Sequence, residues 1–192
     1  MDVLVLTHGA GGNSNAALLV ALGEAFSAAG VSVLRCDLPF RQKRPFGPPS
    51  GSAQQDQDGL RRACALMRKQ FNGRVFLGGQ SYGGRQASLL VADDSSIADA
   101  LLLLSYPLHP PGKPAQLRTA HLPNVKAPTL FVSGTKDPFG TIPEIDSARR
   151  LIPALTDLLP VDGGGHSLLT KANKAELPVV IVSALQRFLP AR

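Results

Sequence analysis

Cysteine is scarce in this sequence of 192 residues, and tryptophan is absent. The two cysteines, Cys36 and Cys64, form no C-x-x-C pair, so we expect neither a disulfide scaffold nor a zinc site. A reducing, cytoplasmic setting is therefore the expectation. The chain is long enough to bury a sizeable core without such cross-links, and its length predicts a single domain over residues 1–192.

Long apolar runs are missing as well. No run approaches the ~18 apolar residues that a membrane-spanning helix needs. The first residues, Met1 to Leu4, lack the basic region of a secretory signal peptide. The sequence thus predicts a protein without a membrane partner.

Charged residues make up only 18% of the chain, against 44% hydrophobic residues, and this balance excludes a disordered chain and a coiled coil. The 20 basic and 14 acidic residues leave a net charge of +6. The basic residues are scattered, and no aromatic residues are interleaved with them as in nucleic-acid binders. We therefore expect a solvated basic surface and no nucleic-acid partner.

Short apolar runs alternate with longer amphipathic segments along the whole chain. Runs such as Val3–Thr7 are apolar on both faces, which is typical of strands covered on both sides. The alternation predicts an α/β fold with a doubly wound, mostly parallel, six-stranded sheet and helices on both faces. The predicted strands are Val3–Thr7, Val31–Arg35, Arg74–Gly78, Ala100–Leu104, Thr129–Ser133 and Leu155–Val161. The predicted helices are 14–28, Gln54–Phe71, Gly83–Ala92, Ile142–Leu151 and Leu177–Leu189, and Leu38–Ser52 and 106–124 are predicted to be irregular.

A Gly-x-Ser-x-Gly pattern stands between the third predicted strand and the helix that follows it, with Ser81 flanked by Gly79 and Gly83. In a nucleophile elbow the serine is held on a sharp, strained turn, so the residues two before and two after it must be small. Ser81 is therefore the candidate nucleophile. The alternative is an ordinary glycine-rich turn in which Ser81 only caps the helix.

A serine hydroxyl needs a base to become nucleophilic, and the base needs an orienting group. His166 follows the sixth predicted strand on a glycine-rich loop, and Asp137 follows the fifth. The carboxyl ends of parallel strands share one edge of the sheet, so we expect Ser81, Asp137 and His166 to meet as a catalytic triad, in the chain order typical of this arrangement. Asp162 is a second candidate for the acid, in a less favourable position relative to its strand.

The segment His8–Gly12 follows the first predicted strand and is rich in small residues. Small residues let backbone N–H groups approach a tetrahedral intermediate. The predicted oxyanion donors are the N–H groups of Ala10, or its neighbour Gly11, and of Tyr82, whereas His8 is expected to be structural. Predicted substrate contacts are Gly9, Gly11, Tyr106 and His109, with packing as the alternative role for the last two.

Two basic positions near this predicted site have more than one interpretation. Arg85 lies in the first turns of the helix after Ser81, where a cation opposes the helix dipole. An ion pair with a carboxylate such as Asp37 is favoured over contact with a substrate anion. The basic group from Arg41 to Arg44 is interpreted as a solvated loop rather than as an edge of the pocket.

The motifs HGAGG, GGQSYGGR, GTKDPFG and GGGHS together resemble the α/β-hydrolase superfamily, and most of all its compact dienelactone-hydrolase-like branch. The segment SYPLHPPGKP, which begins at Ser105, is similar to the small family of the testis-expressed hydrolase-fold protein and the third subunit of the non-specific lethal chromatin complex. The resemblance runs from Val3 to Leu189. It implies a hydrolase fold, and we expect a minimal version that departs from larger hydrolases in two ways: the two leading strands are absent, since Val3 already begins the strand before the His8–Gly12 segment, and there is no room for a cap domain.

The predicted function is a serine hydrolase that cleaves an ester or related acyl bond through an acyl-enzyme, as a carboxylesterase does. Its expected partner is a small-molecule ester or acyl substrate, no metal or organic cofactor is expected, and the protein is expected to be a monomer or a homodimer. The alternative is a hydrolase-fold binding or scaffold protein with a vestigial site, as the resemblance allows. Dinucleotide binding at Gly9–Ser14 is disfavoured, because Ser14 occupies a position where a Rossmann fingerprint has glycine or alanine.

Overall fold

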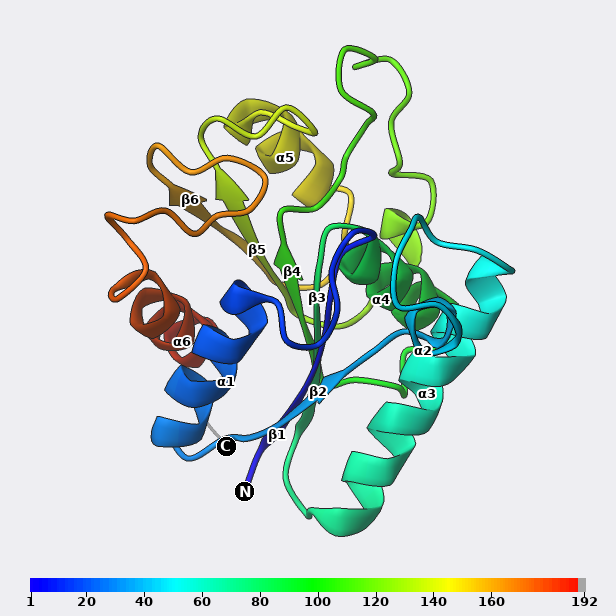
Figure 1. The fold of residues 1–192 in the computed structure, drawn as a ribbon. Coiled ribbons are helices and arrows are strands. Elements are labelled where there is room, and N and C mark those ends of the chain that lie inside the picture. The colour runs from blue at the N-terminus through cyan, green and yellow to red at the C-terminus, as the bar shows by residue number, and fades with distance from the viewer. Residues whose placement is uncertain (190–192) are drawn as a thin grey trace.

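The strands of the computed structural model, which describes residues 1–189, form one parallel sheet (Figure 1). Their order across the sheet is β2-β1-β3-β4-β5-β6. The predicted α/β class, six-stranded sheet and strand positions are confirmed, with shifts of one or two residues at strand ends. The strands are β1 (Val3–Thr7), β2 (Ser32–Cys36), β3 (Val75–Gln80), β4 (Ala100–Leu104), β5 (Thr129–Gly134) and β6 (Thr156–Val161).

Helices cover both faces of this sheet, as a parallel sheet requires. On one face α1 (Ala17–Ala28) packs beside α6 (Leu177–Phe188), seen on the left of Figure 1. On the other face lie α3 (Ala53–Gln70), α4 (Tyr82–Asp93) and α5 (Ile142–Arg149). A short helix α2 (Pro39–Lys43) and a 3-10 turn η1 (Leu122–Asn124) complete the fold. None of the helices in the described part of the chain is both long and apolar enough to cross a membrane.

Each strand supplies alternate residues to two separate cores. In β1, Val3 and Val5 join the core beneath α3 and α4, whereas Leu4 and Leu6 join the core beneath α1 and α6. Side chains that alternate between the two faces explain why β1 is apolar throughout. The apolar runs in the sequence therefore encode burial on both sides of the sheet.

Two helix predictions were inaccurate. The segment after Leu38 was expected to be irregular, but its first residues form α2, because Pro39 suits the first turn of a helix and Phe40 is buried. Helix α1 begins at Ala17 rather than near Ser14. The side chain of Asn13 instead accepts a hydrogen bond from the N–H of Asn15 at 2.9 Å, which holds this stretch as a turn.

The direction in which strands are added reverses between β1 and β3, the second and third strands across the sheet. The chain runs from β1 outward to β2 and then crosses to β3 on the other side of β1. Ligands of such sheets bind beyond the carboxyl ends of the strands at this reversal. The His8–Gly12 segment follows β1 and Ser81 follows β3, so both lie at this position.

We predict that Leu101→Ala lowers the free energy of unfolding by about 2–5 kcal/mol. Leu101 lies in β4 and is 0% exposed, so truncation leaves a cavity in a packed core. The matched control is Leu155→Ala, because Leu155 is 58% exposed. Urea unfolding of both variants measures the difference, and similar losses would contradict the burial of β4.

Candidate active site

Ser81 occupies a sharp, strained turn between β3 and α4. Its backbone has φ of 50° and ψ of −117°, a region that residues with side chains rarely adopt and that costs on the order of 1–3 kcal/mol. The N–H of Ser81 donates to the carbonyl of Leu104 at 2.8 Å, and its carbonyl accepts from the N–H of Arg85 at 3.0 Å. These two hydrogen bonds hold the hydroxyl at the top of the sheet.

Glycine at the two flanking positions has a steric cause. A Cβ on Gly79 would lie 2.5 Å from the backbone of Gly83, and a Cβ on Gly83 would lie 2.4 Å from the carbonyl oxygen of His8. Neither distance is tolerable, and backbone atoms give way less readily than flexible side chains. The turn and the His8–Gly12 segment can approach each other only because both positions lack a side chain.

His166 and Asp137 meet Ser81 at this edge of the sheet. Nε2 of His166 lies 2.8 Å from Oγ of Ser81. Nδ1 of His166 lies 3.0 and 2.9 Å from the two carboxylate oxygens of Asp137. The side chain of Asp137 is 2% exposed and that of His166 is 26% exposed. The structure thus brings together all three residues of the predicted triad, with the imidazole between hydroxyl and carboxylate.

Close contacts between loops fix the position of the imidazole. A Cβ on Gly134, at the end of β5, would lie 2.2 Å from the carbonyl oxygen of Gly164, so the loops after β5 and β6 touch. The ring of Phe139 stacks on the ring of His166 with centroids 4.1 Å apart. Phe139 was missed in the sequence analysis, although it lies in the same motif as Asp137. The alternative acid, Asp162, instead accepts from the Thr135 hydroxyl at 3.4 Å.

The predicted oxyanion donors have no hydrogen-bond partners within residues 1–189, and the same is true of the alternative donor, the N–H of Gly11. Among residues 1–189, neither the N–H of Ala10 nor that of Tyr82 takes part in a hydrogen bond. Tyr82 is the first residue of α4, where an N–H has no acceptor within the helix. Both groups are therefore free to donate to a ligand oxygen. The phenol of Tyr82 has another function: it donates to Asp56 at 2.8 Å, and burial raises its pKa.

Arg41 corrects one interpretation of the sequence. It was expected in a solvated loop, but it is only 5% exposed. Its guanidinium donates to the carbonyls of Gly12 at 2.8 Å, Ala10 at 2.7 Å and Gly47 at 2.9 Å. Arg41 therefore holds the His8–Gly12 segment in place, and no periodicity in the sequence reveals this role because the contacts span about thirty residues.

His8 is structural in the way the sequence predicts. Its Nε2 lies 3.1 Å from the N–H of Leu38, which can only donate, so Nε2 carries the acceptor lone pair. The proton is then on Nδ1, which donates to the carbonyl of Gly9 at 2.7 Å. Burial lowers the pKa of His8, which keeps the ring neutral. This ring links the segment after β1 to the segment after β2.

A cavity of about 760 Å³ opens above Ser81. Of the predicted substrate contacts, Gly9 and Gly11 line it, but Tyr106 and His109 do not. Tyr106 is fully buried and its hydroxyl donates to the carbonyl of Arg118 at 2.7 Å. The full lining is Gly9, Ala10, Gly11, Gly12, Pro49, Gln80, Ser81, Tyr82, Arg85, Pro107, Arg118, Phe139, His166 and Ser167.

The expected ion pair between Arg85 and Asp37 is not formed. The carboxylate of Asp37 accepts from the N–H of Ser14 at 2.6 Å and lies 3.6 Å from Nε2 of His8. Arg85 instead lines the cavity above Ser81, together with Arg118. Arg118 was not identified from the sequence, since its segment has no regular pattern.

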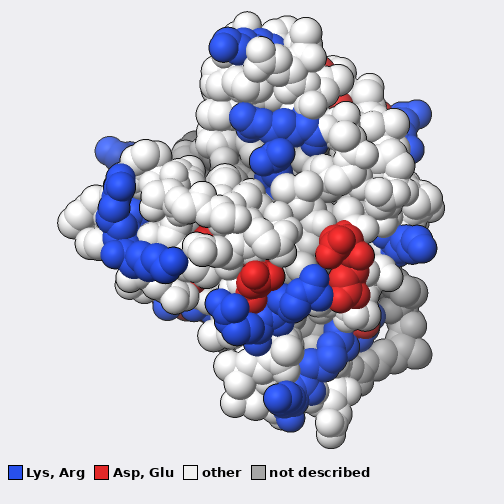
Figure 2. All heavy atoms as spheres, turned by 90° about the vertical axis from the view of Figure 1, so that its right-hand side faces the viewer, with Lys and Arg blue, Asp and Glu red and all other residues white. Residues whose placement is uncertain are grey.

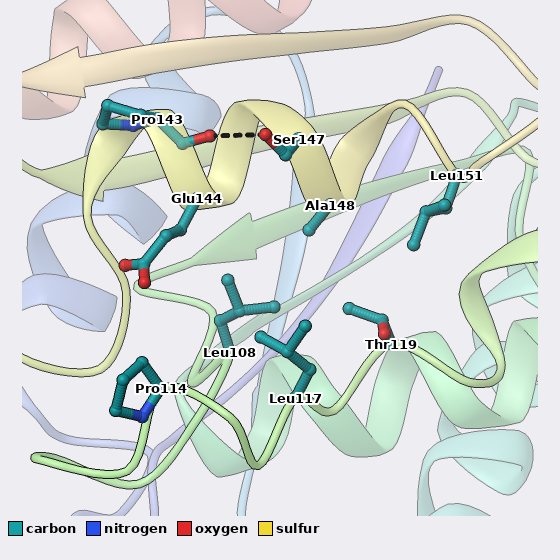
Figure 3. A pocket seen from close by; sticks show the side chains of 9 residues that line it. All are labelled: Leu108, Pro114, Leu117, Thr119, Pro143, Glu144, Ser147, Ala148 and Leu151. Carbon is teal, nitrogen blue, oxygen red and sulfur yellow. Dashed lines mark hydrogen bonds between the residues drawn. The ribbon is translucent and has the colours of Figure 1, made fainter.

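A second cavity, of about 470 Å³, lies between α5 and residues 108–119 (Figure 3). Its walls are largely apolar, and the hydroxyl of Ser147 donates back to the carbonyl of Pro143 at 2.9 Å. Its lining contains no histidine that could act as a base. The chemically equipped cavity is therefore the one above Ser81.

His121 lies beside Arg85 at the back of the site. Its Nε2 is 2.8 Å from Oγ of Ser88, and the Ser88 hydroxyl donates onward to the carbonyl of Arg85 at 2.9 Å. This arrangement suits a tautomer in which Nε2 of His121 donates to the Ser88 hydroxyl. Burial, and then the charge of Arg85, lower the pKa of His121 to about 4, so the ring is neutral at neutral pH.

The comparisons with known proteins agree with this fold. The family model described as "Alpha/beta hydrolase domain" matches residues 1–186. A dienelactone hydrolase structure from Anabaena variabilis is 18% identical, with a TM-score of 0.79, covering 99% of this chain and 88% of that chain. Est1E from Butyrivibrio proteoclasticus, solved with ferulic acid bound, is 16% identical with a TM-score of 0.76, covering 97% of this chain and 89% of its own.

A lidless α/β serine hydrolase from Xanthomonas campestris is also similar, with 18% identity and a TM-score of 0.73. The match covers 98% of this chain and 84% of that chain. The TM-scores of these three structures show a shared fold. The elements of residues 1–189 likewise include no cap domain.

We predict that Arg41→Met lowers the free energy of unfolding by about 1–3 kcal/mol, because two carbonyls of the His8–Gly12 segment, those of Ala10 and Gly12, lose their donor. Amide hydrogen exchange in residues 9–13 should also accelerate. The control is Arg44→Met, since Arg44 is exposed and its Nε reaches only the carbonyl of Phe46. Equal effects of the two substitutions would contradict the proposed role of Arg41.

Acid should destabilise the fold partly through His121. An unfolded histidine takes up a proton near its usual pKa of 6.5, whereas folded His121 does so only near 4. Stability is therefore lost as pH falls from about 6.5 towards 4. Urea unfolding at about pH 7 and about pH 4.5 should show a smaller loss for His121→Gln than for the wild type. Equal losses would show that His121 does not contribute.

Proposed function

Because the chain belongs to the alpha/beta hydrolase domain family, we propose that it is a serine hydrolase that cleaves a small ester or related acyl compound. One observation carries the proposal: His166 lies between Ser81 and Asp137, with Nε2 2.8 Å from the hydroxyl and Nδ1 2.9 Å from the carboxylate. This is the spacing that proton transfer from a nucleophile to a general base needs. Ser81, His166 and Asp137 are the proposed triad.

In the first half-reaction, Oγ of Ser81 attacks the acyl carbon of the substrate, and its proton passes to Nε2 of His166. Asp137 holds the Nδ1–H tautomer and stabilises the imidazolium that forms. Collapse of the tetrahedral intermediate breaks the bond to the leaving group, which takes the proton from Nε2. An acyl-enzyme on Ser81 and a free alcohol result.

The N–H groups of Ala10 and Tyr82 are the proposed oxyanion hole. Both are free of other hydrogen bonds within residues 1–189, and Tyr82 adds the positive end of the α4 dipole. One such donor is worth roughly 3–4 kcal/mol of transition-state stabilisation. Arg41 and the ring of His8 keep the segment that contains Ala10 rigid, which preserves this donor's direction before substrate binds.

In the second half-reaction, water attacks the acyl-enzyme. His166 accepts a proton from the water, a second tetrahedral intermediate forms, and the proton returns to Oγ of Ser81 as the acid leaves. The sequence of steps requires no metal and no organic cofactor. Pro49, Pro107 and Phe139 supply apolar surface in the cavity wall, which suits a small organic acyl group.

The alternative of a binding protein with a vestigial site has less support. It would predict that the proline-rich segment 106–124 fills the cavity. Only Pro107 and Arg118 of that segment reach the wall, and a cavity of about 760 Å³ remains. An open cavity over an aligned triad favours catalysis.

The test is the activity of Ser81→Ala on p-nitrophenyl acetate. We expect kcat/KM to fall by about 10³-fold or more, because the nucleophile is removed while binding groups remain. Covalent labelling by a fluorophosphonate probe should also disappear. Ser147→Ala in α5 is the matched control and should retain both. Equal turnover by wild type and Ser81→Ala would disprove the proposed function.

A further inference from the structure

Two guanidinium groups line the cavity above Ser81 and share no carboxylate. Arg85 projects from α4 one turn after Ser81, and Arg118 comes from the segment that follows β4. Within residues 1–189, no ion pair engages either guanidinium. Because arginine stays protonated in proteins, the cavity holds two positive charges without a counter-charge.

Arg85 is the less satisfied of the two. Its Nε is buried and has no hydrogen-bond partner in the described chain, which is costly for a charged donor. Its neighbour His121 is neutral at neutral pH, and a histidine ring cannot supply a counter-charge. The first turn of α4 contains no acidic residue, and a cation there adds to the positive end of the helix dipole instead of offsetting it.

Arg118 is held in place by its own segment. Its N–H donates to the carbonyl of Leu108 at 2.8 Å, its carbonyl accepts from the hydroxyl of Tyr106, and Nη1 donates to the carbonyl of Pro107 at 3.1 Å. Burial and the charge of Arg85 both lower the pKa of Arg118. The buried Tyr106 thus anchors the backbone that carries a second cation at the wall of the same cavity.

We infer that Arg85 and Arg118 form an anion-binding subsite, and that the preferred substrates are esters that carry a carboxylate. The inference rests on the proposed function, because it names the substrate class of the same site. A carboxylate can accept two hydrogen bonds from one guanidinium while it neutralises both charges. Such a substrate would relieve the repulsion between the arginines and present its carbonyl to Ser81.

The charge of the whole molecule agrees with this substrate class. The net charge is +6. Figure 2 shows Lys and Arg side chains spread over the side of the molecule that carries α3, while Asp and Glu are confined mainly to its lower middle. A positive surface attracts anionic solutes towards the protein and raises the rate of encounter.

The first experiment compares matched esters. For the acyl side, mono-p-nitrophenyl glutarate is compared with p-nitrophenyl pentanoate, which has a methyl group in place of the carboxylate. For the leaving-group side, 4-acetoxybenzoate is compared with 4-acetoxybenzamide. We expect kcat/KM to favour the anionic member of at least one pair by tenfold or more, and the pair concerned identifies which part of the substrate meets the arginines. Ratios near one in both pairs would overturn the inference.

The second experiment removes one guanidinium. Arg85→Gln should reduce the ratio of kcat/KM between anionic and neutral ester at least tenfold, whereas Arg85→Lys should keep part of the preference because the charge remains. The matched control is Arg62→Gln. Arg62 is exposed on α3 and does not line the cavity, so this substitution removes one positive charge from elsewhere on the molecule. A similar fall in the ratio for Arg85→Gln and Arg62→Gln would overturn the inference.

A third measurement separates this inference from the proposed function. If wild type hydrolyses no ester, glutarate binding to Ser81→Ala is measured by calorimetry, with and without Arg85→Gln. Binding that is lost with Arg85→Gln would support the anion subsite although the proposed function had failed. Absence of binding to Ser81→Ala would overturn the subsite. Hydrolysis of neutral esters without an anionic preference would refute the subsite and leave the proposed function standing.

Discussion

The approach of two backbone segments at the β3–α4 turn is the constraint on which the site depends. Gly83 lies so close to the carbonyl of His8 that a Cβ would come within 2.4 Å of its oxygen. This contact sets Ser81 against the segment after β1, where the N–H groups of Ala10 and Tyr82 have no partner within residues 1–189. Strain at Ser81 is tolerated because the surrounding sheet over-determines the turn.

The charged and polar side chains of the site fall into two groups, those with hydrogen-bond or ion-pair partners and those without a counter-charge. Nδ1 of His166 lies 2.9 Å from the carboxylate of Asp137. The guanidinium of the buried Arg41 donates to backbone carbonyls. Within residues 1–189, Nε of Arg85 is buried without a partner, and Arg118 donates to the carbonyl of Pro107 but forms no ion pair with a carboxylate. Buried charges are normally paired, so uncompensated cations beside a nucleophile indicate where a ligand completes the structure. His121 and Tyr106 support this second group from behind, through Ser88 and the backbone of Arg118.

The sequence predicted the positions of side chains correctly where a candidate residue comes directly after a strand. Ser81, Asp137 and His166 each come within a few residues of a strand's carboxyl end, so topology alone predicts that they share an edge. It failed in the irregular segments. Tyr106 was predicted to contact substrate, with packing as the alternative, and the structure buries it; Arg41 was expected in a solvated loop but is buried against the His8–Gly12 segment. Nothing periodic in a proline-rich stretch indicates which side chains turn inward.

The sequence by itself determined the parallel sheet, its covering helices and the loops that hold the candidate triad, because burial on both faces and strand-to-helix turns leave local patterns. Only the tertiary structure decided which cations face Ser81, which aromatic ring stacks on His166 and which histidine is a spacer between backbone segments. Those outcomes depend on contacts between residues far apart in the chain. Such contacts are selected by packing and charge in three dimensions, which no local pattern records.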